Sequence, residues 1–81
     1  MTAIDIELMD LEIKKGREGG YLWGRNRSVK QLKKEIEEVT KILDDMVKEL
    51  GDDIYNNIDY FYLLGWREGV CKALREKERG K

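Results

Sequence analysis

Residues 28–51 read SVKQLKKEIEEVTKILDDMVKELG, and this stretch decides the fold class. Its apolar residues follow an unbroken three-four spacing, which places them along one side of an α-helix. These seam residues are Val29, Leu32, Ile36, Val39, Leu43, Met46 and Leu50. Ser28 and Gln31 form an S-x-x-Q capping box, and Gly51 suits a left-handed position beyond the last turn. The stretch therefore predicts a helix over residues 29–50.

A second helix is expected to begin at Asp52 or Asp53, where acidic side chains suit the helix dipole. It would fold back on the first helix as a helical hairpin of residues 29–50 and 53–78. Between residues 60 and 74 its apolar side chains occupy most of the circumference, so one neighbouring helix cannot cover them. The uncovered surface predicts a bundle formed by homo-oligomerisation.

Small and aromatic residues on the second helix mark its predicted packing interface. Three small residues recur at four-residue intervals and leave space that a close helix neighbour would fill, since each glycine costs about 1 kcal/mol inside a helix. Large aromatic side chains flank them. The predicted helix-packing and oligomer interface comprises Phe61, Gly65, Trp66, Gly69 and Ala73.

Residues 2–15 carry conflicting signals. Ile6 and Leu8 continue an alternation that is typical of a strand, whereas Thr2 as a cap and the lysines before Gly16 are typical of a helix. A short N-terminal helix, with a strand as the alternative, is expected to pack across the hairpin. The chain is therefore predicted to be all-α.

Residues 16–27 read GREGGYLWGRNR, and their four glycines are typical of a loop. This basic, glycine-rich loop would join the N-terminal element to the hairpin at 28–81. The whole chain, residues 1–81, has the length of a single domain. A core this small is thin, so tight helix packing or self-association is expected to support it.

Cysteine and histidine usage excludes several kinds of stabilising or catalytic site. The single cysteine, Cys71, cannot form an internal disulfide, and with no histidine the usual zinc ligands are missing. Cys71 lies among apolar residues, which predicts a buried structural thiol. A free thiol and an acidic N-terminus favour a cytoplasmic protein. The uncharged run at residues 60–66 is far too short to span a membrane, so no membrane partner is expected.

Enzymatic activity is not expected, because no histidine can act as a general base and no nucleophile has its usual activator. Glu35 and Glu38 have a spacing that resembles the helix carboxylates of all-α nucleotide pyrophosphohydrolases. The facing helix offers only Asp59 and Glu68, not a second acidic pair. We therefore expect a solvated acidic face, with no metal and no cofactor.

Charge is strongly segregated along the chain. Residues 14–34 carry eight bases against one acid, and residues 35–57 carry eight acids against two bases. Positive charges crowd the start of a predicted helix, where a bound phosphate would be favourable, and two nearby aromatic rings could stack on a base. The candidate phosphate-binding residues are Arg25, Arg27, Lys30, Lys33 and Lys34, with Tyr21 and Trp23. The alternative ligand of this segment is an acidic protein surface, including the acidic segment of another subunit.

Residues 60–74 read YFYLLGWREGVCKAL and resemble the Gly-Trp-x-x-Gly-x-x-x-Ala-Leu helix of short phage or mobile-element accessory proteins. Such proteins include inhibitors of bacterial immune systems, so the resemblance implies a binder. We expect a non-enzymatic regulator or inhibitor that acts by protein–protein contact as a homo-oligomer. The alternative is a module that binds a nucleotide, a cyclic nucleotide or nucleic-acid phosphate through residues 14–34.

Overall fold

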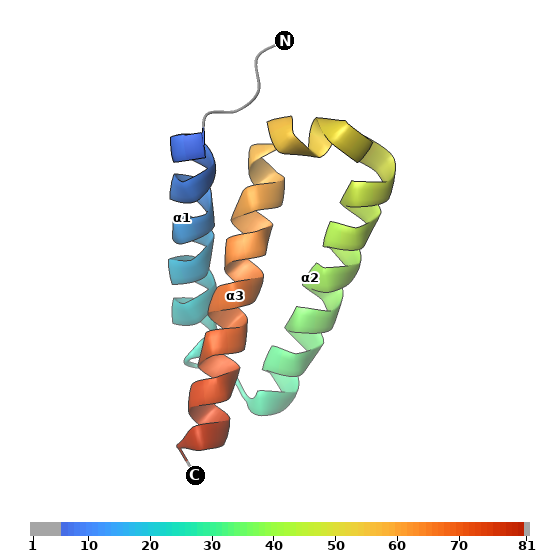
Figure 1. Cartoon of the computed structure of the whole chain (residues 1–81). Helices are drawn as coiled ribbons and strands as arrows, with labels where there is room; N and C mark the ends of the chain where they lie inside the picture. The colour runs from blue at the N-terminus through green and yellow to red at the C-terminus, as the bar shows by residue number, and fades with distance from the viewer. Residues whose placement is uncertain (1–5, 81) are drawn as a thin grey trace.

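The computed structural model describes residues 6–80, which form helices joined by short connections (Figure 1). The elements are α1 (Ile6–Gly24), α2 (Val29–Leu50), the short 3₁₀-helix η1 (Gly51–Asn56) and α3 (Ile58–Arg79). The all-α prediction is confirmed, and the strand alternative is wrong for residues 6–15, which lie within α1. The expected cap at Thr2 lies outside the described residues.

α3 lies between the other two helices, as Figure 1 shows. α1 and α3 run in the same direction. α2, which lies between them in the sequence, runs antiparallel to both. Both α1 and α2 pack chiefly on α3 rather than on each other. The arrangement is elongated and flat, with Cα extents of 49 × 25 × 15 Å.

α2 has the predicted bounds and the predicted cap. The Ser28 hydroxyl accepts the backbone N–H of Gln31 at 3.2 Å, and the Gln31 side chain accepts the backbone N–H of Ser28 at 3.0 Å. At the other end Gly51 takes a φ of +53°, a conformation that glycine adopts without strain. Along the seam, Leu32, Val39 and Leu43 are buried against α3.

The predicted start of the second helix at Asp52 or Asp53 is wrong. The chain forms η1 instead, which buries Ile54 beneath the connection between the long helices. α3 begins only at Ile58, because the Asn57 side chain accepts the backbone N–H of Tyr60 at 3.2 Å and caps the new helix. The connection between α2 and α3 therefore consists of η1 and Asn57.

The predicted loop at 16–27 is also wrong over most of its length, because α1 continues as a helix to Gly24. Gly16, Gly20 and Gly24 are buried at one-turn intervals on the side of α1 that faces α3. Glycine weakens an isolated helix, but here it allows the two backbones to meet. Only the residues between Gly24 and Ser28 form the connection to α2.

The small residues of α1 and α3 interlock. A Cβ atom at Gly16 or Gly20 would overlap the carbonyl oxygen of Tyr62 or Trp66 on α3. Reciprocally, a Cβ atom at Gly65 or Gly69 would overlap the carbonyl oxygen of Ile13 or Arg17 on α1. The hydrogen atom that occupies each of these positions therefore points at a carbonyl oxygen of the facing helix, the geometry of a weak Cα–H···O contact.

This packing changes the basis of the predicted oligomer interface. Gly65, Gly69 and Ala73 do form a tight helix contact, but the neighbour is α1 of the same chain. Phe61 is buried, with 7% of its surface exposed, and Trp66 is partly buried. α3 is thus covered from two sides within one chain, so its apolar circumference no longer requires a second copy.

Candidate binding surface

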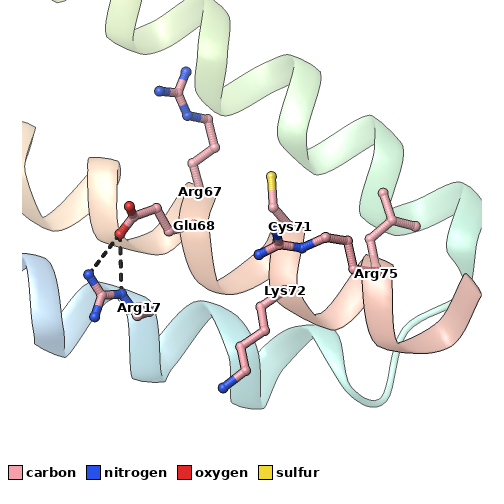
Figure 2. Close-up of a pocket in the computed structure, with 7 residues that line it drawn as sticks. Arg17, Arg67, Glu68, Cys71, Lys72 and Arg75 are labelled. Atoms are coloured by element: carbon pink, nitrogen blue, oxygen red, sulfur yellow. Dashed lines mark hydrogen bonds and ion pairs between the residues drawn. The ribbon is translucent and has the colours of Figure 1, made fainter. Parts of the chain in front are cut away.

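A shallow groove of about 470 Å³ runs along α3 (Figure 2). One lining residue, Arg17, comes from α1, and the others come from consecutive turns of α3. The lining residues are Arg17, Arg67, Glu68, Cys71, Lys72, Leu74 and Arg75. Figure 2 shows Arg67 and Cys71 projecting from α3 toward α2, whereas Lys72 projects toward α1.

The groove is cationic, because four bases and one carboxylate line it. Arg17 holds Glu68 through its Nε and Nη2 atoms, at 3.2 and 3.0 Å from one carboxylate oxygen. Lys72 lies over the ring of Tyr21, with Nζ 4.9 Å from the ring centroid. Arg75 has no ion pair with any of residues 6–80, so its charge is available to a ligand.

Cys71 supplies part of the apolar surface of the groove. The prediction of a buried thiol is wrong, because Cys71 is partly exposed between Arg67 and Arg75 on successive turns. The side chain projects away from α1 and toward α2, and part of its surface stays exposed. Together with Leu74, the thiol gives the groove an apolar centre within a cationic border.

Tyr21 fixes the adjoining part of α1 to α3. Its hydroxyl donates a hydrogen bond of 2.5 Å to the carboxylate of Glu76. This hydrogen bond, together with partial burial of the hydroxyl and the negative charge of Glu76, raises the pKa of Tyr21 above the ordinary 10.0, while Arg25 acts in the opposite direction. The phenol is therefore occupied by an internal contact.

The predicted base-stacking site is not assembled as a platform. Trp23 packs on Trp66 with ring centroids 5.7 Å apart, and the guanidinium of Arg27 lies 4.8 Å from the centroid of the Trp23 ring. Tyr21 faces Lys72 and Glu76 instead. The two predicted stacking rings are thus used in separate helix–helix contacts.

The predicted cationic residues lie exposed around the turn between α1 and α2. They are Arg25, Arg27, Lys30, Lys33 and Lys34. The C-terminal end of α3 reaches the same end of the molecule, as Figure 1 shows, and adds Arg75 and Arg79 to it. The fold therefore gathers positive charge from the turn after α1, the start of α2 and the end of α3 at one end, next to the groove.

The acidic side of α2 does not form a metal site. Within residues 6–80 there is no group of three or more histidine, cysteine, aspartate or glutamate side chains placed to hold an ion. Glu35, one of the carboxylates with pyrophosphohydrolase-like spacing, instead accepts a hydrogen bond of 2.8 Å from the Trp66 indole. Its contact joins α2 to α3.

Sequence reasoning missed the groove residues. Arg67, Cys71 and Arg75 follow one another at four-residue intervals, which places them on one stripe of a helix and could have indicated a shared surface. Arg17 could not be found in this way, because 51 positions separate it from Glu68. Its place in the groove depends on how α1 packs on α3.

Comparisons with models of known protein families, with curated proteins and with solved structures find no match to this chain. None of the helices within residues 6–80 combines the length and the apolar character needed to cross a bilayer.

Proposed function

We propose that this chain is a non-catalytic binding protein whose groove on α3 accepts an acidic segment of a partner protein. The observation that carries the proposal is the convergence of four cations from two helices on one groove with an apolar centre. A regulator or inhibitor of this kind acts by covering the surface that it binds. Charge would steer the encounter, and the apolar centre would contribute affinity.

The spacing of the cations suits a helical or extended acidic segment. Arg67, Cys71 and Arg75 follow one another along α3 at intervals of about 6 Å, the rise of four helical residues. Carboxylates eight residues apart on a partner helix, separated by about 12 Å, would face Arg67 and Arg75, and an apolar residue midway between them would lie over Cys71. Arginine can hold a carboxylate through two parallel hydrogen bonds.

Phosphate-bearing ligands are less well served by this groove. Among residues 6–80, none of the side chains that line it is aromatic, so these residues give a base nothing to stack on. The groove lies along the middle of α3, where backbone N–H groups are used within the helix and none is free for a phosphate. The acidic side of α2 would also repel a long polyanion.

Protection of Cys71 from alkylation tests the proposal. The probe is a synthetic amphipathic peptide with glutamates eight residues apart and a leucine midway between them, four residues from each. At low salt the peptide is expected to slow the reaction of Cys71 with iodoacetamide, a neutral reagent, several-fold. Added salt should restore the rate, because screened surface charges attract less strongly.

Charge reversal tests whether Arg67 and Arg75 are responsible for the protection of Cys71. Arg67→Glu combined with Arg75→Glu is expected to remove the protection, when each variant is compared with its own rate without peptide. Lys41→Glu is the matched control, because Lys41 is an exposed base on α2 outside the groove. An oligonucleotide that protects Cys71 where the peptide does not would overturn the proposal in favour of phosphate binding. Absence of protection by the peptide would also overturn it.

A further inference from the structure

The side of α1 that faces away from α3 carries a stripe of three exposed leucines and two charged residues. Its residues recur with three-four spacing, the pattern of helices that pair along their length. This outer stripe consists of Leu8, Leu11, Lys15, Glu18 and Leu22. The three leucines are 37%, 46% and 55% exposed, respectively, although they are large and apolar.

Within residues 6–80, no other element covers the outer stripe. The buried glycines of α1 face α3 on the opposite side of the helix, and α2 packs on α3 rather than on α1. Repeated exposed leucines on one line of a helix are unfavourable in water, so a partner is expected to cover them. The charges within the stripe identify that partner.

We propose that the outer stripe pairs with the outer stripe of a second copy of this chain, with the two α1 helices antiparallel. In the register that places Leu11 opposite Leu22 of the second copy, Lys15 lies opposite Glu18 of that copy. Two-fold symmetry repeats both pairs, so the interface contains two leucine layers and two ion pairs. All four central positions are then matched with a complementary residue.

Other alignments bring like charges together. A parallel pair places Lys15 opposite Lys15 and Glu18 opposite Glu18 of the second copy. An antiparallel pair shifted to bring Leu8 opposite Leu22 also places Lys15 opposite Lys15. Like charges opposite each other at a seam disfavour pairing, so the stripe selects one register as well as one partner.

The charges of the stripe are available for this exchange. Within the chain, Lys15 Nζ is 3.9 Å from a carboxylate oxygen of Glu12, at the outer limit of an ion pair, and the Lys15 side chain is 57% exposed. Glu18 has no ion pair with any of residues 6–80. Neither stripe charge would therefore lose a strong internal contact on dimerisation.

The proposed dimer leaves the groove open. Arg17, which lines the groove, points toward α3, whereas the outer stripe lies on the far side of α1. Each dimer would present two grooves, and changes to the stripe would not touch the groove. The dimer and the proposed function can therefore fail independently.

Sedimentation equilibrium over a range of concentrations tests the dimer. The mass is expected to rise from the 9.6 kDa of one chain toward about twice that value and to stop there. Lys15→Glu alone and Glu18→Lys alone should each weaken the dimer at least tenfold, because each places like charges opposite each other. Lys15→Glu combined with Glu18→Lys should restore it, because the swapped charges are again complementary.

Lys14→Glu is the matched control, because Lys14 is an exposed base beside the stripe but not part of it, and this change should leave the dimer constant within about twofold. Circular dichroism at a single concentration verifies that each variant remains helical. A chain that stays monomeric throughout, a species larger than two chains, or a double variant as weak as the single ones would overturn the proposal.

Discussion

The glycines of α1 have two different environments, although they lie in one short segment. At Gly20 an added Cβ atom would overlap the backbone carbonyl of Trp66, which cannot move without displacing α3. At the adjacent Gly19 the nearest atoms are the Tyr62 hydroxyl at 3.2 Å and an atom of the Trp66 ring at 3.4 Å, both in side chains. Substitution by alanine is therefore expected to destabilise the protein at Gly20 but not at Gly19.

Gly20→Ala is expected to lower the free energy of unfolding by about 1–3 kcal/mol, the range of an overpacked contact. Gly19→Ala should leave the free energy of unfolding unchanged or raise it by up to about 1 kcal/mol, since alanine favours the helix. Urea denaturation followed by circular dichroism measures both. Equal destabilisation by the two variants would contradict the close approach of α1 and α3.

The Tyr21–Glu76 contact predicts a pH effect at the residue scale. Since the folded pKa of Tyr21 is raised, the neutral phenol is favoured by folding. The stability from this contact is fully present below the unfolded value near pH 10 and is lost as pH rises through the raised pKa. The protein should therefore become less stable in that alkaline window.

Ultraviolet titration measures this pKa, with Tyr21→Phe identifying the contribution of Tyr21. Glu76→Gln is expected to lower the pKa of Tyr21 toward 10.0, because it removes the negative acceptor. Glu78→Gln is the control, because Glu78 is exposed and has no hydrogen bond to Tyr21. An unchanged pKa in the Glu76 variant would show that the carboxylate does not hold the phenol.

At the scale of the elements, α2 and α1 differ in where their stability originates. α2 carries its own start signal, an amphipathic seam and a stop at Gly51, so local sequence and packing agree. α1 contains four glycines and lacks a basic last turn. It depends on the contact with α3, which offsets the low helix propensity of its glycines.

Ser28→Ala tests the local signal of α2. Loss of the capping box is expected to lower the free energy of unfolding by about 1 kcal/mol, because a first-turn N–H group loses its acceptor. Asn26→Ala, in the same connection, should have little effect, since Asn26 is exposed and caps no helix. Thermal unfolding distinguishes the two variants. A Ser28 variant as stable as the Asn26 variant would assign the start of α2 to packing alone.

At the scale of the whole molecule, the topology converts charge blocks along the chain into charged ends. The end formed by the start of α1, by η1 and by the start of α3 carries Glu7, Asp10, Asp52, Asp53 and Asp59. The opposite end gathers the basic turn after α1 and the basic C-terminus of α3. An acidic partner would be steered toward the groove by this separation.

Sequence alone determined α2 to the residue, from Ser28 through Gly51, because capping and an apolar seam are local properties. It also determined the helical character of α3 and the small-residue face at Gly65, Gly69 and Ala73. The predicted start of α3 at Asp52 or Asp53 is too early, because these residues belong to η1. The cap that starts α3 is at Asn57.

Only the tertiary structure decided what Gly16, Gly20 and Gly24 do. Glycines at four-residue spacing are unfavourable in an isolated helix and favourable in one that meets another backbone, and that neighbour lies far along the chain. The same packing brings Arg17 to Glu68 and turns the outer stripe toward solvent. Groove and stripe both depend on the contact between α1 and α3, which no local pattern specifies.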